Sequence, residues 1–263
     1  MLFIPLIVFA IGLLVGSFLN VVILRMNTGR SVVTGRSKCA RCNRTLAWYE
    51  LVPVLSFLVL RGKCRQCRIP ISFQYPLVEL LTAIVFVVSY TKIVIHGGFT
   101  TLAWVSFFFT LVVASLLLVM TVYDLRHKII PDSIVYPFIL LALASVVWKT
   151  FTVPQFSITG AIVDGVIVAL PFFLLWYLSK GRVMGFGDVK LALGIGWLVG
   201  LSIGFGSILL AFWIGAVVGL LLLGVTRKYG MKSEIPFAPF LVSGLFIASM
   251  WGITIQTLFP LWQ

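Results

Sequence analysis

The sequence has little charge, few acidic residues and few cysteines. Only 10% of its 263 residues are charged, whereas 61% are hydrophobic. A soluble domain usually carries about 25% charged residues, so this composition excludes an ordinary soluble globular protein. Apolar runs of about 20 residues recur along the chain, and this is the length that a helix needs to cross a bilayer.

These apolar runs predict an all-α polytopic membrane protein with about eight transmembrane helices. The first run has no basic region before it and no small-residue cleavage site, so we expect a spanning helix rather than a signal peptide. The stretch 190–225 is too long for one crossing, and a tight reversal is predicted near its middle from its glycines, Gly194, Gly196, Gly200, Gly204 and Gly206. The predicted spans are residues 2–24, 76–95, 99–122, 133–150, 156–178, 190–204, 206–225 and 237–258.

Basic residues outnumber acidic ones, 20 to 7, and their distribution is uneven. If the N-terminus lies outside, all Lys and Arg residues except Lys92 and Lys149 fall on one side of the membrane. The positive-inside rule assigns that side to the cytoplasm, so the sequence predicts a multi-pass inner-membrane protein surrounded by lipid. We expect no nucleic-acid partner, because the aromatic residues that could stack on bases lie mostly inside apolar helices.

All four cysteines lie in the first predicted cytoplasmic loop as two C-x-x-C pairs, Cys39 with Cys42 and Cys64 with Cys67. Two such pairs are typical of a tetrahedral zinc site, and nearby basic residues such as Arg41 favour the thiolate form. Two disulfides or a redox couple are the alternative, but the cytoplasm is reducing. Four sulfur ligands leave no open coordination position, so the predicted zinc is structural.

The cysteine loop also sets the predicted domain boundaries. Residues 1–24 form the first transmembrane helix, residues 25–75 a small cytoplasmic zinc-binding domain with four cysteine ligands, and residues 76–263 a transmembrane core. Between the cysteine pairs, the stretch 46–60 is apolar but short for a span, and crossing there would separate the two pairs. We therefore expect this segment to lie on the cytoplasmic surface of the membrane.

Two of the seven acidic residues, Asp124 and Asp188, stand at the cytoplasmic ends of different predicted spans. Ionisable groups at membrane depth are costly, so they are functional candidates. Carboxylates at one depth can converge across a helical bundle and share a proton. One can then activate water while the other donates to a carbonyl. The alternative for Asp124 is a topogenic charge paired with Arg126 or Lys128.

Two glycines precede the second aspartate in the sequence Gly185-Phe-Gly-Asp188. Because Gly185 and Gly187 lack a Cβ, a substrate backbone could lie close to the acid. The alternative is a flexible loop between two helices in which the aspartate caps the second helix.

The remaining acidic residues have weaker signals. Glu50, Glu79 and Glu234 are candidates for binding substrate, although Glu50 and Glu79 could instead anchor a basic loop. Asp132 follows a proline and is predicted to be the N-terminal charge of a helix. Asp164 lies inside an apolar run and is predicted to have a packing or hydrogen-bonding role.

Several ordered motifs cover nearly the whole chain. They are Gly16-Ser-Phe-Leu-Asn20, the two C-x-x-C pairs with Trp48-Tyr-Glu50 and Pro53 between them, Tyr75-Pro-Leu-Val-Glu79, Asp124 with Ile130-Pro-Asp132, Gly185-Phe-Gly-Asp188-Val-Lys190, and Ile235-Pro-Phe-Ala-Pro-Phe240. Together they resemble the type IV prepilin peptidases, also called leader peptidase/N-methyltransferases, a family of GxGD-type intramembrane aspartic peptidases. The chain departs from the family at Arg126, where a second acid is frequent, and at Ala238, where glycine is usual.

The resemblance implies that Asp124 and Asp188 are the catalytic pair of an aspartic endopeptidase. It implies substrates of the prepilin and pseudopilin class, from type IV pilus or type II secretion systems. These are cleaved at the cytoplasmic face between a short basic leader and a hydrophobic helix. It further implies that the same protein methylates the new N-terminus from S-adenosylmethionine, for which no contact residues can be assigned.

Two other classes of function are compatible with the residues alone. An ion-coupled transporter would use the acids to relay ions across the bilayer, but both acids lie at one interface and no chain of carboxylates crosses the core. A noncatalytic membrane scaffold would recruit a partner through the cysteine loop. Such a scaffold would need the four cysteines and not the two aspartates.

Overall fold

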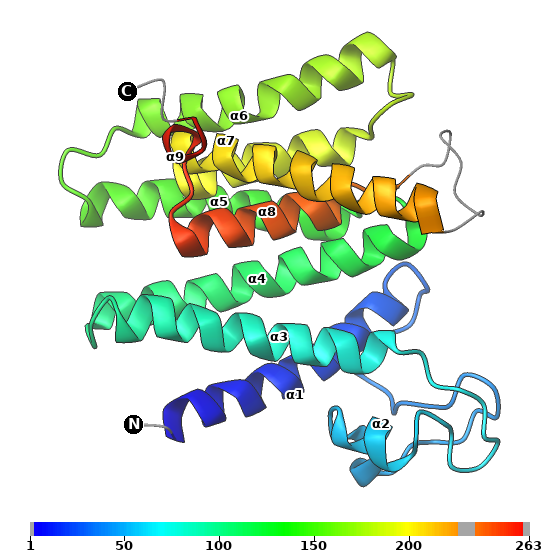
Figure 1. Ribbon diagram of the computed structural model, residues 1–263. Coiled ribbons are helices and arrows are strands. Elements are labelled where there is room, and N and C mark those ends of the chain that lie inside the picture. The colour runs from blue at the N-terminus through cyan, green and yellow to red at the C-terminus, as the bar shows by residue number, and fades with distance from the viewer. Residues whose placement is uncertain (1–2, 226–234, 260–263) are drawn as a thin grey trace. The chain divides into compact units, whose positions relative to one another are not determined.

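The computed structural model describes residues 3–225 and 235–259, which form helices joined by loops (Figure 1). These residues contain no β-strand, and two isolated β-bridges occur in the first loop. The predicted all-α fold is therefore confirmed. In chain order the elements are α1 (Phe3–Arg25), η1 (Trp48–Leu51), α2 (Leu55–Val59), α3 (Gln74–Tyr90), η2 (Thr91–Ile95), α4 (Thr101–His127), α5 (Asp132–Thr152), α6 (Ile158–Ser179), α7 (Phe186–Val225), α8 (Ala238–Trp251) and α9 (Ile255–Leu258).

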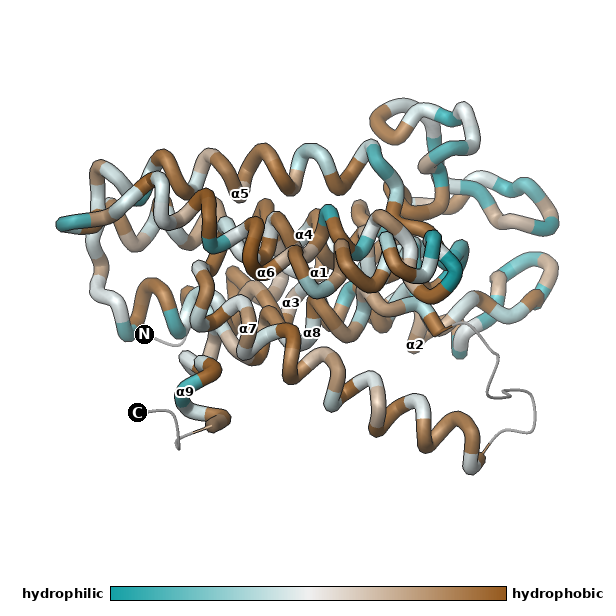
Figure 2. The backbone as a smooth tube through the Cα atoms, turned by 90° about the horizontal axis from the view of Figure 1, so that it is seen from above, coloured by the Kyte–Doolittle hydropathy of each residue, from teal (hydrophilic) through white to brown (hydrophobic). Residues whose placement is uncertain are grey.

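Six of the described helices are long and apolar enough to cross a membrane, namely α1, α3 with its continuation η2, α4, α5, α6 and α7. Figure 2 shows hydrophobic residues along these helices and hydrophilic residues concentrated in the loops. The chain is thus a multi-pass membrane protein. The total of eight spans stays a prediction, because α7 is a 40-residue helix with a break inside it and α8 has only 14 residues.

The break inside α7 is the predicted reversal, but it lies five residues before the boundary expected between the spans 190–204 and 206–225. It lies at Gly200, which has a φ of 79° and a ψ of 178°, a backbone conformation that almost only glycine adopts. The chain turns back there, because a Cβ built on Gly204 would lie 3.8 Å from the Cα of Gly196. In a continuous helix eight residues rise about 12 Å. The run contains many glycines, and the sequence alone does not say which one turns.

Side chains from two neighbouring helices form hydrogen bonds with the backbone on both sides of this turn. Lys149 Nζ of α5 donates a 2.7 Å hydrogen bond to the carbonyl of Leu198, and the N–H of Leu201 donates to Asp164 Oδ2 of α6 at 3.4 Å. A cation therefore meets the carbonyl end of one helical segment, and a carboxylate meets the N–H end of the next. This contact agrees with the hydrogen-bonding role predicted for Asp164.

By internal packing the chain divides into two compact units, Met1–Val119 and Met120–Gln263. In the first unit, α1 packs on α3 through small residues. A Cβ on Gly12 would collide with the backbone of Ala83, and one on Gly16 with Glu79 and Thr82. Such glycine contacts are common between membrane helices. The domain boundaries predicted at residues 24 and 75 stay predictions.

In the second unit, α5, α6 and α8 all pack against α7. Glycines again allow the close approach: a Cβ on Gly196 would lie 2.6 Å from the Cα of Gly165, and one on Gly244 would collide with the carbonyl of Ser207. The start of α7, which carries Asp188, thus belongs to the same packed unit as the end of α4, which carries Asp124.

Candidate active site and metal site

Asp124 lies in the last turn of α4 and is almost fully buried, with 5% of its surface exposed. Its Oδ2 accepts a 3.2 Å hydrogen bond from the backbone N–H of Ala238, the first residue of α8. The first N–H groups of a helix have no partner within the helix, and they favour a negative group beside them. The carboxylate of Asp124 is therefore fixed by a helix that begins 114 residues later in the chain.

Asp188 lies in the first turn of α7, where its N–H donates to the carbonyl of Gly185 at 3.3 Å. The two carboxyl groups are close enough to interact electrostatically. Oδ1 of Asp188 is buried, and it has no hydrogen-bond partner among the described residues. The structure thus brings the two predicted acids together and leaves one buried oxygen available.

The two glycines of the motif have different surroundings. A Cβ on Gly185 would meet only the N of Gly187 and Oδ2 of Asp188, at 3.9 and 4.0 Å, so there is room beside the acid. A Cβ on Gly187 would lie 2.9 Å from the Cβ of Ile130. Gly187 is therefore needed for close packing against the segment that precedes α5.

Lys190 and Asp132 form an ion pair in the same unit, with Nζ and Oδ1 2.6 Å apart. Asp132 is the first residue of α5, as the helix-start prediction expected. Nζ of Lys190 also lies 4.6 Å from the ring centre of Tyr136 in α5. These contacts hold the first turn of α7 against α5, a function that sequence reasoning did not assign to Lys190. Its place two residues after Asp188 was the available signal.

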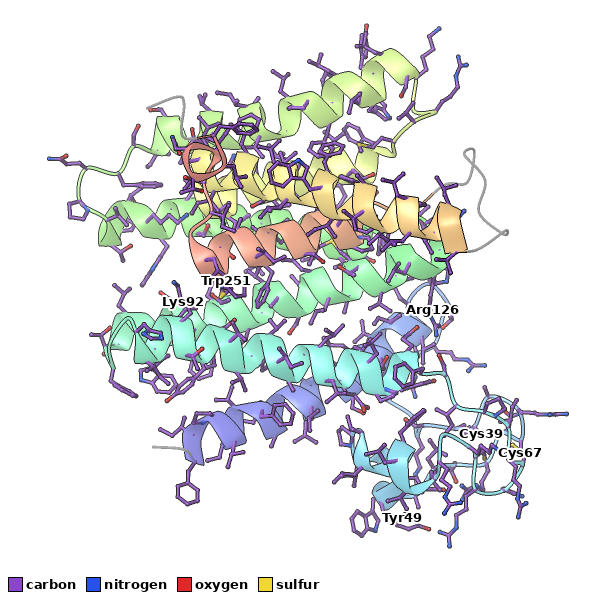
Figure 3. All side chains as sticks on the ribbon, in the orientation of Figure 1. Cys39, Tyr49, Cys67, Lys92, Arg126 and Trp251 are labelled. Carbon is purple, nitrogen blue, oxygen red and sulfur yellow. The ribbon has the colours of Figure 1, made fainter. Side chains whose placement is uncertain are left out.

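The four cysteines converge in the first unit, although 21 residues separate the two pairs. Their sulfur atoms all lie within 4.8 Å of one another, and Sγ of Cys39 lies 3.7 Å from Sγ of Cys67 (Figure 3). A disulfide would need about 2.05 Å, whereas two sulfurs bound to one tetrahedral zinc lie about 3.8 Å apart. The donor set therefore fits a zinc ion, and all four thiols are free.

The two cysteine pairs have the same local structure. The N–H of Cys39 donates to the carbonyl of Arg44, and the N–H of Cys64 donates to that of Ile69, both at 2.9 Å. In the second turn the backbone N–H groups of Cys67 and Gln66 lower the pKa of the Cys64 thiol to about 6. The thiolate is the form that binds zinc, so this shift favours metal binding at Cys64. At Cys67, the Ile69 N–H acts to lower the pKa of the thiol, but burial and the neighbouring thiols outweigh it and raise that pKa to about 11.

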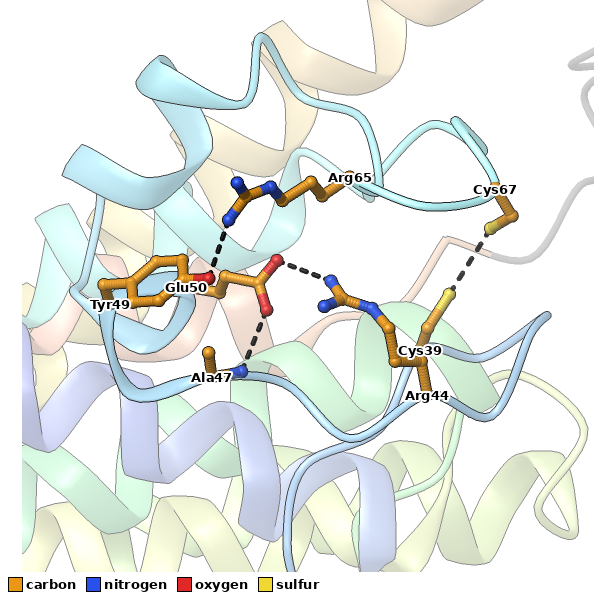
Figure 4. A network of polar contacts seen from close by, with 7 residues as sticks. All are labelled: Cys39, Arg44, Ala47, Tyr49, Glu50, Arg65 and Cys67. Atoms are coloured by element: carbon orange, nitrogen blue, oxygen red, sulfur yellow. Dashed lines mark hydrogen bonds and ion pairs between the residues drawn. The ribbon is translucent and has the colours of Figure 1, made fainter.

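Glu50 lies between the cysteine pairs and forms polar contacts with two other residues of the same loop (Figure 4). Its Oε2 accepts a 2.9 Å hydrogen bond from the N–H of Ala47, and its Oε1 forms a 2.5 Å ion pair with Arg44. Burial acts to raise the pKa of Glu50, but the Ala47 N–H and the Arg44 guanidinium outweigh it and hold that pKa below its usual value. Both oxygens have partners inside the loop, so substrate binding by Glu50 stays a prediction.

Glu79 is also engaged inside the first unit. Its Oε2 accepts a 2.8 Å hydrogen bond from the N–H of Val54, which joins the cysteine loop to α3. On the neighbouring helix, the side chain of Asn20 donates to the carbonyl of Tyr75 at 3.1 Å. A role of Glu79 in substrate binding stays a prediction, and the third candidate, Glu234, lies outside the described residues.

Comparison with known proteins covers both units. Residues 10–93 match the bacterial peptidase A24 N-terminal domain, and residues 111–220 match the type IV leader peptidase family. Three similar proteins are each named prepilin leader peptidase/N-methyltransferase. That of Aeromonas hydrophila is 30% identical over 94% of this chain and 91% of its own length, and that of Bacillus subtilis 30% over 95% of each. That of Myxococcus xanthus is 38% identical over 72% of this chain but only 54% of its own length. No solved structure matches the chain.

Proposed function

Because the chain belongs to the type IV leader peptidase family, we propose that it removes the leader from type IV prepilins and pseudopilins and N-methylates the new N-terminus. Asp124 and Asp188 are the proposed catalytic residues. One observation carries this assignment: two acids from different helices of one packed unit interact electrostatically, and Oδ1 of Asp188 is buried without a partner.

The cleavage step follows from the chemistry of two adjacent carboxyl groups. The ionised carboxylate takes a proton from water as the water oxygen attacks the scissile carbonyl carbon, and the protonated carboxyl donates to the carbonyl oxygen. When the C–N bond breaks, the carboxyl group that took the proton from water donates it to the amine nitrogen. The other carboxylate regains its proton from a hydroxyl of the tetrahedral intermediate, and the new carboxyl group remains on the leader. Because Ala238 fixes Asp124 Oδ2, we assign Oδ1 of Asp188 to the water or the substrate.

The leader and the cysteine loop are proposed to lie at the cytoplasmic face of the inner membrane. The positive-inside rule supports this orientation, because 10 of the 20 basic residues lie in residues 25–75. Cys39, Cys42, Cys64 and Cys67 would hold a structural zinc ion, since four thiolate ligands leave no open position. When bound, S-adenosylmethionine would supply the methyl group, and we assign no residue to it.

The apolar part of the cysteine loop is proposed to rest on the bilayer surface. It contains only the short elements η1 and α2, neither long enough to span. Trp48 is 78% exposed, and Leu55, Leu58 and Val59 are 60 to 81% exposed. Tryptophan and apolar side chains beside basic residues favour the interface between water and lipid.

The test is cleavage of a purified prepilin by the wild-type protein, Asp124→Asn and Asp188→Asn in detergent. We expect both variants to lose cleavage while they keep the wild-type melting temperature and zinc content. Zinc content also serves as a control, because the four cysteines belong to the first unit and both aspartates belong to the second. Cleavage retained by either Asp124→Asn or Asp188→Asn would remove that residue from the mechanism.

A further inference from the structure

Hydroxyl groups in the described membrane helices commonly donate to a carbonyl of their own helix. In α4, Thr110 Oγ1 donates to the carbonyl of Ser106 and Ser115 Oγ donates to that of Leu111, both at 2.8 Å. Thr82, Ser145 and Ser207 make the same kind of bond in other helices. Such bonds satisfy a hydroxyl that has no access to water.

Thr121 in α4 departs from this pattern. Its Oγ1 is buried and has no hydrogen-bond partner. Among the described residues, only four buried side-chain polar atoms lack a partner. Two of them belong to the second unit, and these are Thr121 Oγ1 and Asp188 Oδ1.

The positions of these two atoms connect them to the same site. Thr121 precedes Asp124 by three residues in α4, and residues spaced i and i+3 are neighbours on one helix surface. Asp124 in turn interacts electrostatically with Asp188. Thr121 therefore lies one turn before Asp124 in α4, and the second unpartnered atom is an oxygen of the acid that interacts with Asp124.

Buried polar atoms without partners are unfavourable, so they persist in native proteins mainly where a water or ligand completes them. A group that supplies the missing hydrogen bonds must be able to bond to the hydroxyl of Thr121 and also to the carboxyl oxygen of Asp188. A water molecule meets that requirement, and peptide hydrolysis at these two acids consumes one water.

We propose that Thr121 is a further residue of the active site, and that its hydroxyl binds the attacking water together with Asp188 Oδ1. This inference rests on the proposed peptidase function. The water donates one hydrogen to Thr121 Oγ1 and the other to the ionised carboxylate of the pair, so its lone pair faces the scissile carbonyl carbon. The second hydrogen is the proton transferred during attack, and Thr121 itself gains and loses none.

The experiment compares Thr121→Val, which removes the hydroxyl at nearly constant volume, with Thr121→Ser, which keeps it. We expect Thr121→Val to lower kcat for prepilin cleavage about tenfold through the loss of one hydrogen bond to the reacting water. KM should stay the same, and the solvent deuterium isotope effect on kcat should change. Thr121→Ser should keep most of the wild-type kcat.

Thr110→Val is the matched control. It removes a hydroxyl from the same helix, but this hydroxyl already donates a hydrogen bond to the carbonyl of Ser106. It should leave kcat within about twofold of wild type, since the hydroxyl does not reach the acids. If Thr121→Val does not fold, Thr121→Ala against Thr121→Ser gives the same comparison.

A wild-type kcat and isotope effect in Thr121→Val, or an equal loss of kcat in Thr121→Ser, would overturn the inference. Failure of the proposed function is distinguishable, because Asp124→Asn and Asp188→Asn would then keep their activity. If both aspartate variants are inactive and Thr121→Val is fully active, only the role of Thr121 is refuted.

Discussion

At the residue scale, Gly185 and Gly187 have different roles, although the sequence predicts the same role for both. Both glycines were expected to let a substrate backbone approach the acid. The space beside Gly185 is open toward Asp188, whereas the position that a Cβ would take at Gly187 is occupied by Ile130. One glycine therefore leaves room at the site, and the other is required for folding.

Alanine at each position tests this difference. Gly187→Ala should lower the free energy of unfolding by about 1–3 kcal/mol through overpacking, and Ile130→Ala in the same chain should restore part of it. Gly185→Ala should melt like wild type but raise KM for prepilin, because the added methyl group faces the space beside Asp188. Thermal unfolding in detergent and steady-state cleavage measure the two effects. A normal melting temperature for Gly187→Ala, or a normal KM for Gly185→Ala, would contradict this assignment.

Two of the three acids named as candidates for binding substrate have partners inside the protein. Glu50 pairs with Arg44 within the cysteine loop, and Glu79 accepts the N–H of Val54. Val54 has a φ of 60°, an unfavourable backbone region for a β-branched residue. The bond to Glu79 stabilises this conformation and joins the loop to α3.

At the element scale, the break in α7 determines how this long apolar run folds back. Gly200 adopts a backbone conformation that other residues rarely reach, and Lys149 and Asp164 satisfy the two helix ends beside it. The segment 186–199, which carries Asp188, is therefore fixed at one end by this turn. At its other end Lys190 pairs with Asp132.

Gly200→Ala should destabilise the protein by about 1–3 kcal/mol, since a side chain there would force a strained φ. Gly224→Ala is the control from the same helix, because a Cβ there would meet no atom within 4 Å. It should be neutral or stabilise the helix by about 0.5–1 kcal/mol. Thermal unfolding measures both variants, and an equal melting temperature for the two would argue against the turn at Gly200.

At the scale of the whole molecule, the four cysteines provide a test of membrane orientation. They are the only cysteines of the chain, and all of them lie in the loop between α1 and α3. A membrane-impermeant maleimide should label them after zinc chelation in inside-out vesicles, but not in intact spheroplasts. Labelling in intact spheroplasts would place the loop outside and contradict the positive-inside assignment.

A cysteine introduced at His96 is the control for labelling from the outer face of the membrane. His96 lies in the exposed turn between η2 and α4, on the other side of the predicted membrane. The His96→Cys variant should react with the same reagent in intact spheroplasts. This control shows that the reagent reaches the outer face and that the chain has inserted.

The sequence by itself determined the membrane class and most of the spans, and it singled out the four cysteines that lie close together and the two acids proposed as catalytic. Each of these depends on local or compositional properties. A run of apolar residues has to match the thickness of a bilayer, two C-x-x-C pairs match one tetrahedral metal, and acids are rare in such a chain. Asp124 and Asp188 could therefore be selected before their contacts were known.

Only the tertiary structure decided which groups meet these residues. The N–H of Ala238 reaches Asp124 across 114 positions, Lys149 meets Leu198 across 49, and Glu50 proves to be paired with Arg44. The turn at Gly200 and the unpartnered hydroxyl of Thr121 likewise depend on how the helices pack. Local patterns fix where helices form and how deep their ends lie, but side-chain partners depend on the relative rotation and packing of helices distant in sequence.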